Sequence, residues 1–406
     1  MCNLIKLFAV SLAFMVILLT GCNGKPTTVV QGEVLAKAGL QYYWRLDLNL
    51  GKGESLVRLA RLDENLYCLT NRHRLMALDA TRGLLKWSKS IADPSSTVFL
   101  PSHADGIKIS ANPLSVTEVL SPERAVSLPP FDGVFINTLS YMLLLDRETG
   151  EQRRQIPFDF AANTSGVSDS TYFYVGSTRG WYYAIRLNEA VQEWILAAED
   201  MITAPIQHFR DRIYVADNSG NLYATKVAVR GTKVWEKHLN GPVTAEFHVD
   251  ERGCFVACDD HRVYAFDLAR GQSLWEHPFI CQGPLRDPIQ VSENTIYQLA
   301  RRDKFYAINL ATGKQRWALP EGRKVLGVSE GDVFCLSSSG DLLVVDEILG
   351  TVKTSLPMTG WEFFVANAVE PTIYAASKSG KLACIRKLEA GMLTPEDLRT
   401  SDDLSR

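Results

Sequence analysis

The sequence lacks the features that mark most membrane-spanning proteins and many enzymes. Beyond its N-terminal segment, no apolar run approaches the length of about 18 residues that a membrane-crossing helix needs. There is no G-x-S-x-G motif, no H-E-x-x-H motif and no phosphate-binding loop. Basic residues are not in excess, because 43 Lys and Arg stand against 46 Asp and Glu. This balance argues against nucleic-acid binding, which requires a concentrated basic face.

Metal-binding and disulfide patterns are also missing. None of the eight cysteines forms a C-x-x-C pair or a Cys/His spacing typical of zinc. Cys254 and Cys258 fall in one expected strand, about 13 Å apart, beyond the roughly 7 Å limit for a disulfide. A long-range pairing of Cys281 stays open. His261 follows Asp259-Asp260 in an expected hairpin turn, where aspartate is favoured for its backbone hydrogen bonds. We therefore predict no metal site and no catalytic residue.

What the sequence does contain is a repeated unit. The segment Phe305–Trp317 reads F-Y-A-I-N-L-A-T-G-K-Q-R-W, which predicts a short strand, a turn and the start of a second strand. Close copies are Val263–Trp275 and Leu75–Trp87, each with glycine four residues before tryptophan. The turn recurs, with alanine once in place of glycine, at Gly83, Gly150, Ala190, Gly231, Gly271, Gly313, Gly350 and Gly391.

The spacing of this turn predicts the fold class. Successive turns are separated by 67, 40, 41, 40, 42, 37 and 41 residues. A period near 40 with alternating apolar residues is typical of one four-stranded blade of a β-propeller. We predict an all-β, eight-bladed propeller of four-stranded antiparallel blades over residues 41–388. The last repeat has no tryptophan after it, and Trp44 precedes the first repeat, so an N-terminal strand is expected to close the ring.

The tryptophans divide into two groups. Those in register have a fixed place once per blade, which inter-blade packing requires and a carbohydrate groove does not. The predicted blade-packing residues are Trp44, Trp87, Trp194, Trp235, Trp275 and Trp317. In the two repeats that lack tryptophan, Arg154 and Thr354 stand at its position. Trp181 and Trp361 fall outside the register and are predicted to be exposed contact residues.

The N-terminus is typical of an exported lipoprotein. Residues 1–21 contain the apolar run 7–19 and end in Leu19-Thr20-Gly21 before Cys22, a pattern similar to a bacterial lipobox. We predict a signal peptide at 1–21, lipid attachment at Cys22 and a tether over 22–40. Asn23 then implies sorting to the outer membrane in a double-membrane cell. The alternative is a plain secretory peptide with an incidental cysteine.

Two further segments lie outside the regular repeat. The gap of 67 residues contains an insertion around 91–130 with six prolines, which we expect to be irregular apart from a short strand pair near 107–119. Such a loop binds partners in some proteins and is a plain insertion in others, and both readings stay open. Residues 389–406 are expected to form a C-terminal tail with one helical turn at 394–398.

The repeat resembles a known family. The pattern A-x-D-x-x-x-G-x-x-x-W, present at Ala77–Trp87 and Ala265–Trp275, resembles the PQQ-type propeller repeat over residues 42–386. Signal peptide, lipobox, tether, a single eight-bladed ring and a closing N-terminal strand together resemble the BamB-type lipoproteins of outer-membrane protein assembly. That resemblance implies a non-catalytic, lipid-anchored periplasmic scaffold without a cofactor, which docks the POTRA domains of a BamA-like barrel protein.

Two other functions stay open. Quinoprotein dehydrogenases carry the same repeat around pyrroloquinoline quinone (PQQ) and calcium, often with adjacent cysteines, which this sequence lacks. A propeller lipoprotein could also bind an unrelated glycan or peptide, since one fold hosts many functions. The sequence does not identify the partner-binding residues. Leu285-Arg286-Asp287 is faintly similar to the partner-binding loop of the BamB family, and a purely structural loop is the favoured interpretation.

Overall fold

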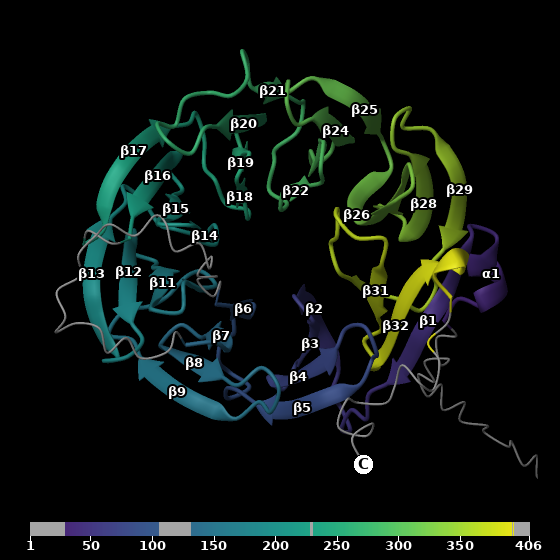
Figure 1. The fold of residues 1–406 in the computed structure, drawn as a ribbon, viewed down its shortest axis with the longest axis horizontal. Helices are drawn as coiled ribbons and strands as arrows, with labels where there is room; N and C mark the ends of the chain where they lie inside the picture. The colour runs from purple at the N-terminus through teal and green to yellow at the C-terminus, as the bar shows by residue number, and fades with distance from the viewer. Residues whose placement is uncertain (1–28, 105–130, 228–229, 392, 394–406) are drawn as a thin grey trace, which may run out of the picture.

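The chain folds into a closed ring of eight β-sheets around a central axis (Figure 1). The structure is a computed structural model, and it describes residues 29–104, 131–227, 230–391 and 393. Each sheet has four strands, every neighbouring pair is antiparallel, and the order from the ring axis outward follows the chain in seven of the eight blades. The all-β, eight-bladed prediction is confirmed.

The blades are numbered in chain order. Blade 1 consists of β2 (Leu56–Leu62), β3 (Asn65–Thr70), β4 (Arg74–Asp79) and β5 (Leu85–Ser90); blade 2 of β6 (Ser102–His103), β7 (Val134–Asn137), β8 (Tyr141–Leu145) and β9 (Gln152–Pro157); blade 3 of β10 (Val167–Ser168), β11 (Tyr172–Gly176), β12 (Trp181–Arg186) and β13 (Val191–Ala197); blade 4 of β14 (Gln207–Phe209), β15 (Arg212–Ala216), β16 (Asn221–Lys226) and β17 (Thr232–His238). Blade 5 consists of β18 (His248–Asp250), β19 (Gly253–Cys258), β20 (Arg262–Phe266) and β21 (Phe279–Ile280); blade 6 of β22 (Gln290–Val291), β23 (Thr295–Leu299), β24 (Phe305–Asn309) and β25 (Gln315–Leu319); blade 7 of β26 (Gly322–Ser329), β27 (Asp332–Ser337), β28 (Asp341–Asp346) and β29 (Val352–Pro357); blade 8 of β30 (Phe363–Phe364), β31 (Ile373–Ala376), β32 (Lys381–Lys387) and β1 (Leu40–Asp47).

The ring is closed by the N-terminal strand. β1 pairs antiparallel with β32 from Leu40 opposite Lys387 to Asp47 opposite Lys381, with Trp44 opposite Cys384. Figure 1 shows the purple β1 beside the yellow β32 on the outside of blade 8. The predicted closure is therefore confirmed, and it joins the two ends of the propeller in one sheet.

Burial follows the position of a strand within its blade. The middle strands lie between two neighbouring sheets and bury both faces, so that all six residues of β3 are buried. The outer strands alternate instead, and in β5 only Trp87 is fully buried. The hydrophobic core is thus a series of layers between adjacent blades, for example Tyr67 and Leu75 of blade 1 packed with Val134 and Leu143 of blade 2.

The turns divide between two faces of the ring. Turns between the first and second strands and between the third and fourth strands of a blade share one face. We call it the insertion face, because β6 ends and β7 begins there, on either side of the insertion in the sequence. The opposite face, with the middle turns and the links between blades, is the link face. The strand pair expected near 107–119 lies outside the described residues, as does the helical turn expected at 394–398. A short 3-10 helix, η2 (Leu388–Ala390), follows β32.

Part of the segment expected to be a tether packs onto the ring. Helix α1 (Gly32–Ala36) lies outside blades 7 and 8 (Figure 1), with Leu35 fully buried. Val30 donates its backbone N–H to the carbonyl of Thr359, in the link before blade 8. None of the helices in the described residues is long and apolar enough to cross a membrane.

Candidate functional site

The in-register tryptophans each lie against the turn of the following blade. All six are 4–7% exposed, and a Cβ atom added to the facing glycine would come within 3.0 Å of the tryptophan side chain. The facing pairs are Trp44 with Gly83, Trp87 with Gly150, Trp194 with Gly231, Trp235 with Gly271, Trp275 with Gly313, and Trp317 with Gly350. Each of these glycines has a positive φ, the conformation that glycine adopts at least cost.

A hydrogen bond completes this contact between blades. The indole N–H donates to a backbone carbonyl three residues before the glycine, at 2.8–3.1 Å, in the pairs of Trp44, Trp87, Trp235, Trp275 and Trp317. We refer to the tryptophan, the facing glycine and this carbonyl as the indole lock. The tryptophan side chains of the indole locks are buried between blades, so they present almost no aromatic surface to a ligand.

The two tryptophans outside the register behave differently from each other. Trp181 is 39% exposed, which agrees with the exposure expected for it. The prediction for Trp361 is wrong, because this side chain is only 6% exposed. Its indole N–H donates to the hydroxyl of Tyr42 at 3.3 Å, beneath Val30 and Leu35 of the N-terminal segment. Blade 7 has Thr354 in place of the repeat tryptophan, and Trp361 packs in the cluster that includes Val344 and Leu356 of that blade.

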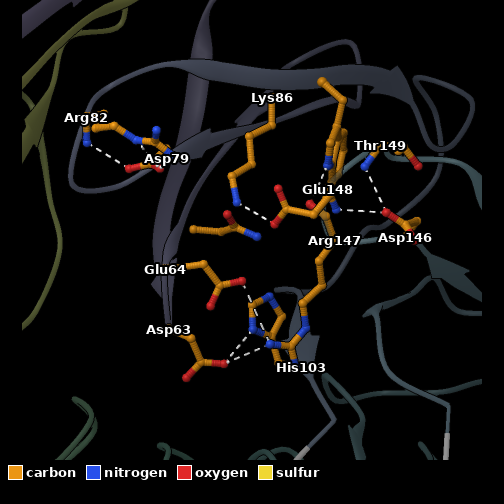
Figure 2. Close-up of polar contacts among 12 residues, drawn as sticks. Asp63, Glu64, Asp79, Arg82, Lys86, His103, Asp146, Arg147, Glu148 and Thr149 are labelled. Atoms are coloured by element: carbon orange, nitrogen blue, oxygen red, sulfur yellow. Dashed lines mark hydrogen bonds and ion pairs between the residues drawn. The ribbon is translucent and has the colours of Figure 1, made fainter. Parts of the chain in front are cut away.

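A network of charged side chains on the insertion face joins blades 1 and 2 (Figure 2). Arg147, in the turn after β8, lies 2.8 Å from a carboxylate oxygen of Asp132 and donates to the carbonyl of Ala104 at 3.2 Å. It also lies 3.4 Å from Asp63 and 3.9 Å from Glu64, in the turn of blade 1. One guanidinium therefore ties both ends of the insertion, at Ala104 and Asp132, to the neighbouring blade.

His103 forms the buried part of the same network. Its Nδ1 lies 2.8 Å from Asp63 and its Nε2 2.7 Å from the hydroxyl of Tyr67, which also accepts a hydrogen bond from Asn65. A neutral imidazole with its proton on Nδ1 satisfies both contacts. Burial lowers the pKa of His103, and the hydrogen bond to Asp63 acts in the opposite direction. Burial raises the pKa of the Tyr67 hydroxyl.

This arrangement suits docking better than acid–base chemistry. Both ring nitrogens of His103 are occupied, and the Tyr67 hydroxyl stays protonated at neutral pH. The carboxylates point outward instead: the side chains of Asp63, Asp132 and Glu148 are 62%, 67% and 64% exposed. Glu148 is bound by Lys86 of blade 1 at 2.6 Å (Figure 2). The network thus links Ala104 and Asp132 to blade 1 and presents acidic groups to solvent.

The Leu285-Arg286-Asp287 segment lies on the link face between blades 5 and 6. Leu285 is buried. Arg286 donates from Nε and Nη2 to both carboxylate oxygens of Asp259, and Asp287 accepts from Arg301 at 2.6 Å. Both ion pairs tie the link to turns of the adjacent blades, and the side chains of Arg286 and Arg301 are 53% and 50% exposed. These ion pairs fix the position of the loop, which agrees with the interpretation of the segment as a structural loop.

The remaining candidates add no reactive centre in the described part of the chain. Six cysteines are free and buried, and the nearest polar neighbours of the Cys281 thiol are the carbonyls of His261 and Gly283. His261 has a positive φ in its hairpin turn. Among the described residues, no three His, Cys, Asp or Glu side chains lie together as a metal-binding group. Cys22, the expected lipid-attachment residue, lies outside the described residues.

Sequence reasoning missed the network of Arg147 and His103. Its members come from turns 40 and 84 residues apart, and they do not recur from blade to blade. The long gap between Gly83 and Gly150 was a signal in the sequence for the insertion. It did not identify the residues that contact the two ends of the insertion.

Comparisons with known proteins agree with this architecture. A family model described as outer membrane protein assembly factor BamB matches residues 140–278 and again 259–391, which together make up more than half of the chain. The crystal structure of BamB from Moraxella catarrhalis superimposes with a TM-score of 0.62 at 13% sequence identity, covering 86% of this chain and 97% of that one.

Two other similarities show how widely the fold is shared. The computationally designed Ika8 protein superimposes with a TM-score of 0.61 at 12% identity, over 83% of this chain and 98% of that one. A polyvinylalcohol dehydrogenase from Sphingopyxis sp. (strain 113P3) is 20% identical over 297 residues, or 65% of this chain. The chain spans 44% of the length of that enzyme. Likeness at this level of identity shows the fold alone.

Proposed function

The chain belongs to the family of the outer membrane protein assembly factor BamB, and from this premise we propose that it is a non-catalytic scaffold that aids the assembly of outer-membrane β-barrel proteins. The observation that carries the proposal is the family match over residues 140–391. A ring that covers 97% of the BamB chain from Moraxella catarrhalis supports it.

We propose that the scaffold is held at the outer membrane by a lipid on Cys22 and faces the periplasm. Val30 is fixed on the link before blade 8, so only the short segment from Cys22 to Val29 separates the lipid from the ring. These eight residues reach at most about 29 Å when fully extended. The blade 7–8 side of the ring would therefore stay near the membrane surface.

The partner we propose is a barrel protein with POTRA domains, similar to BamA. Rigid loops on a closed ring are suited to this role, because the backbone of a preorganised surface changes little on binding. Both faces of the ring offer ordered, charged groups: the carboxylates around Arg147 on the insertion face, and the Arg286 and Arg301 pairs on the link face.

A crosslinking experiment tests the proposal and locates the docking face. A photoreactive residue is placed at Glu148, on the insertion face, or at Arg286, on the link face, in the full-length protein in its own membranes. Recovery of a POTRA-containing barrel protein from either position supports the scaffold function, and the reactive position identifies the face. The matched control is Cys22→Ser, which we expect to release the protein from the membrane and weaken recovery. Absence of any such protein, with the bait intact and lipidated, would overturn the proposal.

The dehydrogenase similarity supports a second candidate, a PQQ- and calcium-dependent enzyme. The purified protein, incubated with PQQ and calcium, is assayed with a secondary alcohol polymer and an artificial electron acceptor. We expect no turnover above that of the heat-denatured protein. Cofactor-dependent turnover would contradict the proposed scaffold function and support an enzymatic function instead.

A further inference from the structure

The turn between β28 and β29 of blade 7 exposes two large apolar side chains. It reads D-E-I-L-G from Asp346 to Gly350. Ile348 and Leu349 are 75% and 70% exposed, and together with Val369 they are the most exposed large hydrophobic side chains in the described residues. We call Ile348 and Leu349 the blade 7 tip.

The other repeats carry polar residues at this place. Leu349 stands directly before the glycine of its turn, and in six of the other seven turns the equivalent residue is polar: Arg82, Thr149, Glu189, Arg230, Arg270 and Thr312. The remaining turn has Ala390 there. Two adjacent, exposed aliphatic side chains at an otherwise polar position favour a contact with an apolar partner.

The backbone N–H groups of the turn are paired within the turn itself. Those of Ile348 and Leu349 donate to one carboxylate oxygen of Asp346, at 3.0 and 2.9 Å, and that of Gly350 donates to the carbonyl of Asp346 at 2.9 Å. The other carboxylate oxygen of Asp346 lies 3.0 Å from the ammonium of Lys353. Unpaired backbone groups are costly in a lipid environment, and these three N–H groups would enter it already paired.

An indole lock holds the base of this turn. Trp317 of blade 6 lies against Gly350, and its indole N–H donates to the carbonyl of Glu347 at 2.9 Å. Glu347 also donates its own N–H to the carbonyl of Gly331 at 2.9 Å. The tip is therefore presented on a fixed turn, and little ordering entropy is lost when it is buried against a partner.

The tip lies on the side of the ring from which the N-terminal segment departs. β29 connects the tip to Thr359, whose carbonyl accepts the N–H of Val30, and α1 follows outside blades 7 and 8 (Figure 1). β29 has six residues and is about 20 Å long. The eight residues from Cys22 to Val29 reach at most about 29 Å, so a lipid on Cys22 and the tip can reach the same membrane surface.

We propose that the blade 7 tip inserts into the interface of the phospholipid bilayer and, together with the lipid on Cys22, sets the orientation of the ring. This rests on the proposed lipid anchor of the scaffold. The anchor keeps the ring at the surface, so insertion of the tip is an effectively intramolecular step. Burying one aliphatic side chain favours such a step by about tenfold or more. The edge of blade 7 then faces the membrane.

The test uses the full-length, lipidated protein in its own membranes with a benzophenone amino acid in place of Leu349. After irradiation, phospholipid adducts on the peptide that contains position 349 are identified by mass spectrometry. The matched control carries the same amino acid in place of Ile280, which is 63% exposed on the outer strand of blade 5. We expect lipid adducts at position 349 and none at position 280. Equal lipid adducts at both positions, or adducts at 349 only with a second copy or another protein, would overturn the proposal.

A second measurement keeps the benzophenone at position 349 and changes its neighbour. Ile348→Ser should lower the yield of lipid adducts by about tenfold or more, because one aliphatic side chain is removed from the interface. The control, Val369→Ser, removes an equally exposed side chain from the loop between β30 and β31 and should leave the yield unchanged. A yield that Ile348→Ser does not alter would contradict insertion of the tip.

The outcomes also separate this proposal from the scaffold function. If lipid adducts are absent while the anchored protein still recovers the POTRA-containing barrel protein, the tip proposal fails and the scaffold function stands. If the protein is missing from the membrane fraction, the lipid anchor fails and the tip proposal fails with it.

Discussion

The indole of Trp87 lies against Gly150 of the next blade, where a Cβ atom would stand 2.5 Å from ring carbon Cδ2. Its N–H donates to the carbonyl of Arg147 at 2.8 Å. Glycine and tryptophan stand four residues apart in four of the repeats, yet they belong to two different contacts: Gly83 receives Trp44, and Trp87 covers Gly150. The repeat motif is thus a chain of contacts between blades, which explains why it recurs around the ring.

Replacing Gly150 with alanine should destabilise the ring because Trp87 must move. We expect overpacking to cost about 1–3 kcal/mol beyond the backbone strain at a positive φ. Gly340→Ala is the control: its φ is also positive, at 89°, but no atom lies within 4 Å of the added Cβ. Denaturant unfolding followed by circular dichroism measures the difference. Equal losses in the two variants would show that Trp87 adjusts without cost.

The contrast between Trp87 and Trp361 shows what the sequence could predict. Gly150 and Trp87 belong to a repeat of about 40 residues, and most neighbouring blades make the same tryptophan–glycine contact. The spacing of the repeat was therefore enough to predict the fold, the ring closure and the register of the tryptophans. Trp361 was expected to be exposed because it is out of register. It is buried since the N-terminal segment packs over it, and that contact between distant residues has no repeated signature. The network around Arg147 was missed for the same reason.

Arg147→Met should loosen the root of the insertion. The guanidinium contacts Asp63, Asp132 and the carbonyl of Ala104, and an incompletely paired charged network costs about 1–3 kcal/mol. Hydrogen–deuterium exchange should accelerate at residues 102–104 and 131–135. Arg82→Met, which breaks only the Arg82–Asp79 pair within one turn, is the control and should leave those residues unchanged (Figure 2). Identical exchange in both variants would contradict the role given to Arg147.

Glu54 should make the free energy of unfolding depend on pH in the acidic range. Arg74 donates to both of its carboxylate oxygens, at 2.8 and 2.7 Å, and this lowers the pKa of Glu54 from 4.5 to about 2. A carboxyl group with a depressed folded-state pKa contributes stability above its unfolded-state pKa, here 4.5, and loses it as the pH falls towards 2.

Glu54→Gln should therefore cost about 2 kcal/mol at neutral pH, because a charge-assisted pair is lost. The difference from the unsubstituted protein should shrink between pH 4.5 and 2. Urea unfolding at a series of pH values measures it, with Glu276→Gln as the control at a side chain that is 91% exposed. A difference that stays constant over this window would mean that the Arg74 pair does not stabilise the fold.

The six described cysteines should resist alkylation in the native ring. All are buried, and burial raises the pKa of the Cys281 thiol to about 11 and that of Cys335 to about 12, so little reactive thiolate is present. Iodoacetamide labelling followed by peptide mass spectrometry should detect modification only after guanidinium chloride is added, with Cys281 the first to react. Rapid labelling of Cys68 without denaturant would show that blade 1 opens readily.

Leu35 should stabilise the contact between blades 7 and 8, although it lies outside the propeller repeats. Its side chain is fully buried in α1, in the cluster that includes Trp361 and Met358, and truncation of a buried leucine costs about 2–5 kcal/mol. We expect Leu35→Ala to lower the denaturation midpoint and to make Trp361 accessible to acrylamide, measured as the fluorescence difference between this variant and the same variant with Trp361→Phe. Glu33→Gln, in the same helix but exposed, should change neither quantity. Equal midpoints for the two helix variants would mean that α1 lies on the ring without stabilising it.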